Sequence, residues 1–428
     1  MLYHIREAQR AVLTPLSTWA ASVSQLYSNP YSPLSYTPMA NRISAGLDLL
    51  HRLGKDYEKP GFDLPETRVD GQPVSVVERI EVAKPFCRLI KFERLLPPSL
   101  AARAHDPVML VFAPLSGHHS TLLRDTVRAL LPDHTVYITD WVDARMVPVS
   151  EGPFHLDDYV NYAMEFIRHL GPQVHVMSVC QPTVPVLAAI SLLAAMEDPN
   201  QPLTMTMMGG PIDTRRNPTE VNNLAQQRNF KWFERNLIYR VPGRYPGAGR
   251  RVYPGFLQHA GFVAMNPDRH MNSHWDYYLN LVRGDMDDAE SHRAFYDEYN
   301  AVLDLPAEYY LETVRTVFQL HALPLGQWDV QVGGSPLRVS PGQIRRVALF
   351  TIEGELDDIS GSGQTQAAHD LCTGIPKRNK HHLTVEGAGH YGIFSGRRWR
   401  EVIYPRVRDF VRANHPSRDK SRAAAARV

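Results

Sequence analysis

The 428-residue chain has few cysteines, no excess of charge of either sign and no long hydrophobic run. Its three cysteines, Cys87, Cys180 and Cys372, are too few for a disulfide framework. Lysine and arginine number 46 against 45 aspartates and glutamates, so no overall field attracts nucleic acid or anionic lipid. No segment approaches the roughly 18 apolar residues that span a membrane, and none resembles a secretory signal. These absences predict a soluble, cytoplasmic protein with free thiols.

Motifs for cofactors are also absent. Gly247-Ala248-Gly249 does not join a strand to a helix, so it is not a phosphate-binding loop. The adjacent pairs His118-His119 and His381-His382 lack the carboxylate–histidine spacing of a metal site. The basic stretch Arg406–Arg422 is typical of a solvated terminal helix and tail. We therefore predict no metal and no resident cofactor.

Hydrophobic patterning divides the chain into three parts. Residues 1–70 carry apolar residues at helical spacing and predict an N-terminal helical segment. Residues 71–211 and 344–428 alternate strand-like with helix-like stretches, which predicts a parallel α/β sheet. Residues 212–343 interrupt this alternation with loops, helices and many aromatic residues. An insertion of this kind is typical of a cap or lid over an active site.

Cys180 occupies the most informative position in the chain. It ends the strand-like run Val174–Cys180 and precedes Val184–Ile190, which has the composition of a buried helix. A sharp strand-to-helix turn is where hydrolases of the α/β class hold their nucleophile. The elbow reads Ser178-Val179-Cys180-Gln181-Pro182 instead of G-x-S-x-G, with a small residue before the turn and a proline suited to the first helical turn. A cysteine here predicts acyl transfer through a thioester.

A thiol nucleophile needs a histidine base, which a carboxylate orients, and in this architecture the chain order is nucleophile, acid, histidine. Asp357 follows the strand-like run Val347–Ile352 on a turn, with Asp358 as the neighbouring alternative. His390 lies on a glycine-rich turn after Leu383–Val385. Cys180, Asp357 and His390 each follow their own predicted strand in this order and together predict a catalytic triad.

The tetrahedral intermediate of acyl transfer needs two N–H donors. One is expected from the backbone of Gln181, directly after the nucleophile. The other is expected from Leu115 or Ser116, in the loop that follows the apolar run Pro107–Pro114. The sequence leaves the choice between these two residues open.

The cysteine elbow, the segment Gly354–Gly361 and the segment Gly387–Gly392 together resemble those of the intracellular poly(3-hydroxybutyrate) depolymerases of bacteria. The resemblance extends over nearly the whole chain. It implies an α/β-hydrolase fold with a mostly parallel sheet and a helical cap, with Cys180 as nucleophile, His390 as base and Asp357 as its partner. It also implies that the substrate and partner is a cytoplasmic granule of stored polyester.

The related polyhydroxyalkanoate synthases provide the alternative. They share a cysteine elbow, but theirs usually has glycine where this chain has Ser178 and Pro182, which favours the depolymerase. A synthase-like enzyme would be an acyltransferase that uses hydroxyacyl-coenzyme A, and coenzyme A is also a possible acyl acceptor for a depolymerase. A granule-binding protein with an inactive triad is a third possibility. The sequence specifies neither the oligomeric state nor the surface that contacts a granule.

Overall fold

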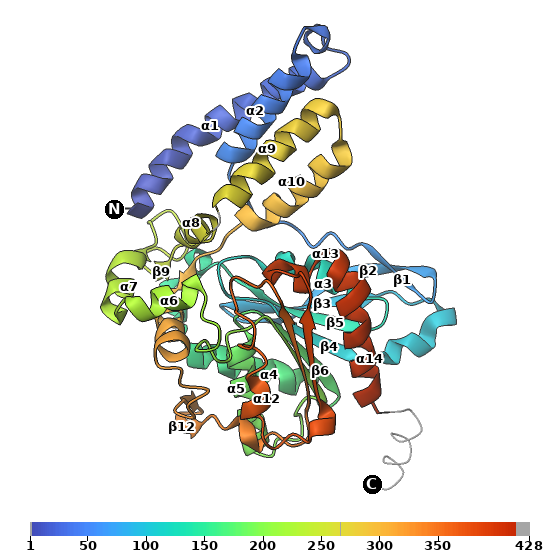
Figure 1. Ribbon diagram of the computed structural model, residues 1–428, viewed down its shortest axis with the longest axis vertical. Helices are drawn as coiled ribbons and strands as arrows, with labels where there is room; N and C mark the ends of the chain where they lie inside the picture. Colours follow the sequence, from blue (N-terminus) through green and yellow to red (C-terminus); the bar gives the residue numbers. More distant parts are fainter. Residues whose placement is uncertain (1, 266, 417–428) are drawn as a thin grey trace.

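A nine-stranded sheet forms the centre of the molecule. The computed structural model describes residues 2–265 and 267–416 (Figure 1). The strand order is β1-β2-β3-β5-β4-β6-β7-β13-β14. The strands are β1 (Glu66–Val69), β2 (Gln72–Ala83), β3 (Cys87–Arg94), β4 (Val108–Phe112), β5 (Thr135–Trp141), β6 (Val174–Val179), β7 (Thr204–Met208), β13 (Ala348–Gly354) and β14 (Lys380–Val385). The pairs from β5 to β14 are parallel and those from β1 to β5 antiparallel. The predicted α/β class is confirmed.

Helices cover both faces of this sheet. They include α3 (Arg124–Leu130), α4 (Leu156–Leu170), α5 (Thr183–Ala195), α12 (Ala368–Leu371) and α14 (Tyr404–Asn414). Alternate residues of β4 enter different cores: Leu110 packs in the cluster that holds α4 and α5, whereas Met109 packs in the cluster that holds α3 and α14. A strand buried on both faces must be apolar at every position, which explains the continuous apolar runs in the sequence.

One boundary in the sequence prediction needs correction. The sheet begins at Glu66, inside the segment 1–70 that was predicted to be helical. β1 pairs with β2 through the two-residue turn Asp70-Gly71, in which both residues have positive φ (49° and 80°). Such a turn matches the twist of a hairpin, but the short polar strand before it has no apolar periodicity that would reveal it.

The segment between β7 and β13 holds helices, two small sheets and a hairpin of helices. Its elements are α6 (Glu220–Gln227), α7 (Phe230–Leu237), β8 (Tyr239–Arg240), β9 (Arg251–Tyr253), α8 (Gly255–Met265), α9 (Pro267–Arg283), α10 (Met286–Asn300), β10 (Leu305–Pro306), α11 (Ala307–Thr313), β11 (Asp329–Val332) and β12 (Ser335–Arg338). The sequence indicated helices and loops here, and the short strands are an addition from the structure.

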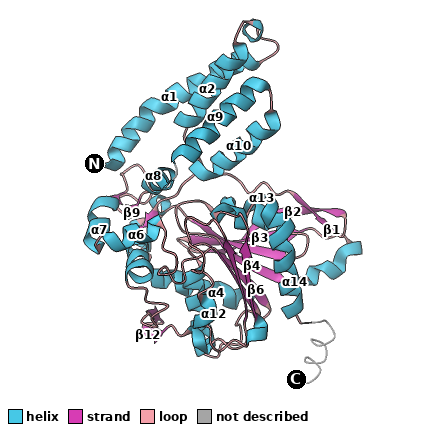
Figure 2. Cartoon of the chain, in the orientation of Figure 1, coloured by secondary structure: helices cyan, strands magenta, loops and turns pink. Residues whose placement is uncertain are grey.

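Four helices form an arm that projects from the α/β body (Figures 1 and 2). The N-terminal pair is α1 (Leu2–Ser28) and α2 (Ala40–Gly54), and it lies beside α9 and α10. Polar contacts join the two pairs: Arg52 donates to Asp297 at 2.9 Å, and the Tyr277 hydroxyl donates to Asp48. Residues far apart in the chain thus build one structural unit.

None of the helices in the described part of the chain has the length and apolar character needed to cross a bilayer. The end of the predicted basic tail, beyond residue 416, lies outside the described residues.

Candidate active site

The predicted nucleophile lies on a strained turn between β6 and α5. Cys180 has φ +67°, in the left-handed region that residues with a Cβ rarely adopt. The turn is held by the Cys180 N–H, which donates to the Met208 carbonyl at 2.7 Å, and by Thr183, whose hydroxyl donates to the Cys180 carbonyl at 2.9 Å. The side chain of Cys180 is partly exposed, whereas Cys87 and Cys372 are fully buried. The structure therefore presents this thiol at the surface of a cavity.

His390 and Asp357 lie next to each other beside this turn. His390 Nδ1 is 2.8 Å from Asp357 Oδ2, and both side chains are buried. The other carboxylate oxygen accepts hydrogen bonds from the backbone of Ile359 and Ser360, at 2.9 and 2.8 Å. Asp358 is exposed and forms no hydrogen bond with any described residue. The geometry thus assigns the contact with His390 to Asp357 and not to its neighbour.

The protonated form of His390 is electrostatically favoured. Burial acts against a charged imidazole, but the Asp357 carboxylate and the sulfur of Cys180 outweigh it and raise the pKa of His390 well above 6.5. An imidazole with this surrounding can accept a proton from a thiol and hold it as an imidazolium. This is the electrostatic requirement of a thiolate nucleophile paired with a histidine.

Two glycines that the sequence analysis did not single out make room for this arrangement. A Cβ on Gly210 would lie 1.8 Å from the Thr183 hydroxyl, and one on Gly209 would lie 2.6 Å from Ile393 and 3.3 Å from Asp357 Oδ2. Both glycines lie on the turn that directly follows β7. The turn itself packs directly against the elbow and the His390–Asp357 pair. In the sequence, a Gly-Gly pair directly after a buried strand is the signal that could have revealed this close packing.

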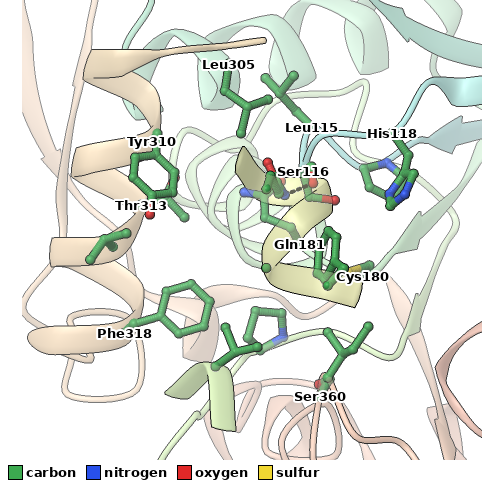
Figure 3. Close-up of a pocket in the computed structure, with 18 of the residues that line it drawn as sticks. Leu115, Ser116, His118, Cys180, Gln181, Leu305, Tyr310, Thr313, Phe318 and Ser360 are labelled. Carbon is green, nitrogen blue, oxygen red and sulfur yellow. Dashed lines mark hydrogen bonds between the residues drawn. The ribbon is translucent and has the colours of Figure 1, made fainter. Parts of the chain in front are cut away.

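Cys180 and His390 line one end of an apolar cavity of about 440 Å³ (Figure 3), and Asp357 contacts His390 from outside the cavity wall. Cys180, Gln181, Ser116 and His390 contribute its polar end. The remaining walls come largely from the segment between β7 and β13, through Leu224, Phe233, Leu305, Tyr310, Val314 and Phe318. The cavity therefore suits an extended, mostly apolar ligand that carries a reactive polar group at one end.

The loop after β4 is held by the elements around it. The carbonyls of Leu115, Ser116 and Gly117 accept hydrogen bonds from three places: the Tyr309 hydroxyl at 3.2 Å, the Gln258 side chain, and the Leu303 N–H at 2.8 Å. Within the described residues, the N–H groups of Leu115, Ser116 and Gln181 donate to no protein acceptor. These are the donors that the sequence predicted for an oxyanion, and the choice between Leu115 and Ser116 stays open.

The neighbouring histidines pack as neutral side chains. Burial lowers the pKa of His118 to about 4 and that of His119 to about 3. The His118 ring stacks on Phe262 with ring centres 5.5 Å apart. Among the residues that the structure describes, no group of three or more His, Cys, Asp and Glu side chains could hold a metal ion.

Residues 209–415 match the family described as the C-terminus of PHB de-polymerase. The match includes Gly209, the whole segment between β7 and β13, Asp357 and His390, while Cys180 precedes it. The chain is a relative of the PHB depolymerases. Its fold is that of the α/β hydrolases: the elbow follows a central parallel strand, Asp357 and His390 follow β13 and β14, and the insertion lies between β7 and β13.

Solved structures resemble this relative of the PHB depolymerases only remotely. The monoacylglycerol lipase of Paleococcus ferrophilus is 12% identical, with 72% of this chain and 96% of the lipase covered and a TM-score of 0.42. A serine hydrolase of Cycloclasticus zankles is 10% identical, with 79% and 99% covered and a TM-score of 0.43. The 2-hydroxy-6-oxo-6-phenylhexa-2,4-dienoate hydrolase of Rhodococcus sp. strain RHA1 is 11% identical, with 79% and 99% covered and a TM-score of 0.41. No curated protein matches the chain.

Proposed function

We propose that the protein is an intracellular depolymerase that hydrolyses poly(3-hydroxybutyrate) through a cysteine acyl-enzyme. The observation that carries the proposal is the array of Cys180, His390 and Asp357 at the end of an apolar cavity. The match to PHB depolymerases supports a polyester as the substrate. The granule of stored polymer would then be the partner of the enzyme in the cytoplasm.

The chemistry follows from the positions of the three groups. His390 takes the proton of Cys180, and the sulfur attacks the ester carbonyl of the polymer. The N–H of Gln181 and that of Leu115 or Ser116 stabilise the negative oxygen of the tetrahedral intermediate. As this intermediate collapses to a thioester, His390 protonates the leaving hydroxyl of the shortened chain. Water then attacks the thioester with His390 as base, which releases the hydroxyacid and restores the thiol.

A thiol nucleophile also favours a second candidate, an acyltransferase that works with hydroxyacyl-coenzyme A. The acyl-enzyme intermediate is a thioester in both cases. Transfer of the acyl group to another thiol forms a new thioester of similar energy, whereas transfer to water loses the free energy of the thioester bond. The two candidates therefore differ in the acceptor rather than in the first step.

One pair of incubations separates these candidates. With amorphous poly(3-hydroxybutyrate) particles and no coenzyme A, we expect the wild-type protein to release free 3-hydroxybutyrate or its short oligomers. With 3-hydroxybutyryl-coenzyme A as the only substrate, we expect no polymer. Polymer formation, or product release that requires coenzyme A and yields hydroxybutyryl-coenzyme A, would assign the acyltransferase instead.

Tyr309 is expected to act as a positioning residue for the oxyanion loop. Its hydroxyl is the hydrogen-bond donor to the Leu115 carbonyl, and the planar trans peptide couples that carbonyl to the Ser116 N–H. Tyr309→Phe keeps the ring and frees the loop, so kcat should fall about tenfold while KM changes less than about twofold, because an oxyanion donor acts in the transition state. Both constants can be measured on a soluble hydroxybutyrate oligomer.

Tyr159→Phe provides the matched control for this variant. Tyr159 stacks on Tyr309 with ring centres 5.9 Å apart and is equally buried, but its hydroxyl has no hydrogen-bond partner within the described residues. Removal of that hydroxyl should leave kcat unchanged. Equal losses in the two variants would mean that packing, and not the bond to Leu115, explains the effect.

A further inference from the structure

The far end of the helical arm carries no charged residue. Residues 11–41 contain no Asp, Glu, Lys or Arg, although 21% of the whole chain is charged. This stretch comprises most of α1, the connecting turns and the first residues of α2, and Figure 1 shows that it reaches the point of the arm most distant from the sheet. We call residues 11–41 the uncharged tip.

The charge is missing from the tip alone and not from the arm as a whole. Where α1 and α2 approach the body, Arg10 binds Asp56 at 2.6 Å, and Asp297 binds Arg52 and Lys55 at 2.9 and 3.0 Å. Ordinary solvation of a projecting arm would favour charges along its whole length. Because charged residues are absent only from the uncharged tip, we infer that this surface is adapted to contact something other than water.

Large apolar side chains are exposed on this tip. Tyr31 is 95% exposed, Tyr36 80%, Met39 62% and Trp19 54%. They lie on one projecting hairpin and not as single residues scattered over the molecule. A cluster of this kind commonly marks an interaction site.

Most hydroxyl groups of the tip already donate hydrogen bonds to backbone carbonyls. Thr18 donates to the Thr14 carbonyl at 2.9 Å, Thr37 to the Leu34 carbonyl at 2.6 Å, and Tyr36 to the Pro30 carbonyl at 2.9 Å. A polar group that keeps an internal hydrogen bond loses little when water is removed, whereas an unpaired one is costly to bury. The tip can therefore be dehydrated against an apolar surface at small cost.

We propose that the uncharged tip docks the enzyme onto the surface of its solid polyester substrate, an inference that rests on the proposed function. An aliphatic polyester has no charge and no hydrogen-bond donor, and its only polar groups are ester acceptors. The tip, like the polymer, carries no charge. It also offers two hydrogen-bond donors that bind no described residue, the Trp19 indole and the Tyr31 phenol, and these can donate to ester oxygens. An anionic lipid surface would instead be matched by lysine and arginine.

The arm that carries the tip is joined through the chain to one wall of the active-site cavity. The arm helix α9 follows α8 in the chain, and α8 carries Phe262, which lines the cavity, and Gln258, which holds the Ser116 carbonyl. Docking through the arm would thus tether the cavity to the particle that supplies its substrate.

The test measures binding to amorphous poly(3-hydroxybutyrate) particles by co-sedimentation, in a Cys180→Ala background so that the particles are not consumed. Tyr31 and Tyr36 are replaced together, once by aspartate and once by lysine. Both double variants should weaken binding at least about tenfold, since either charge must be dehydrated on docking. With Cys180 intact, both should hydrolyse a soluble oligomer at the wild-type rate but degrade particles more slowly.

Ile80→Asp with Val402→Asp, and the same pair changed to lysine, are matched controls, because Ile80 and Val402 are exposed apolar residues outside the arm. They should bind particles as the wild type does.

Three results would overturn the proposal: unchanged binding of the tip variants, weakening by aspartate alone, or equal loss of binding to neutral phosphatidylcholine vesicles. A wild-type dimer that the tip variants convert to monomer, with particle binding intact, would assign the tip to a second copy. Tip-dependent binding by a protein that cleaves no ester would sustain the docking site and refute the proposed function.

Discussion

Cys180→Ala is expected to lower the release of 3-hydroxybutyrate from amorphous polymer by about 10⁴-fold or more, because Cys180 is the proposed nucleophile that His390 activates. Alanine removes only the sulfur and keeps the strained turn, whose hydrogen bonds are made by backbone atoms and Thr183. The thermal midpoint should therefore stay close to that of the wild type. Activity and unfolding can be measured on the same preparation.

Cys372→Ala is the control for the loss of a thiol. Cys372 is fully buried away from the cavity, and burial raises its pKa to about 12, so it is neither accessible nor reactive. This variant should keep its activity, and iodoacetamide should inactivate it as it does the wild type. Substantial polymer hydrolysis by Cys180→Ala, or inactivation by labelling at a cysteine other than Cys180, would contradict the assignment.

The second large effect is expected from Asp357→Asn, which should lower kcat by about 10²- to 10⁴-fold. Asparagine can still accept the N–H groups of Ile359 and Ser360, so the turn keeps its shape. It carries no charge to stabilise the imidazolium, and its amide group can force the wrong tautomer on His390. Because Asp357 helps to raise the pKa of His390, that pKa should also fall, which an NMR titration of the imidazole would detect.

Asp358→Asn is the matched control, one residue along the same turn. Its side chain is exposed and does not reach His390, so kcat should stay within about twofold of the wild type. If the two substitutions had the same effect, the loss would reflect the turn and not the carboxylate that contacts the histidine.

The sheet and the order of the candidate triad were accessible from the sequence because both depend on local patterns. Strands buried on two faces must be apolar at every position, so β4, β6 and β13 are visible as continuous runs. Residues that follow the carboxyl ends of parallel strands meet at one edge of the sheet, so Cys180, Asp357 and His390 could be expected together. Their catalytic roles stay predictions until the variants are measured.

Other features depend on contacts that no local pattern encodes. β1 was missed because a four-residue polar strand has no periodicity, and only its pairing with β2 makes it a strand. The importance of Gly210 becomes visible only when Thr183 is seen against it. The arm unites helices that are far apart in the chain through contacts such as that of Tyr277 with Asp48.

By itself, the sequence determined the α/β class, the cysteine elbow and the uncharged stretch, because composition and spacing are local properties. Tertiary structure alone decided that Asp357 and not Asp358 contacts His390, since neighbouring residues on a turn differ only in the direction of their side chains. It also decided that Tyr309 and Gln258 hold the loop beside the nucleophile, and that the uncharged stretch stands at the far end of an arm. Each of these depends on distances between segments that the chain brings together only when it folds.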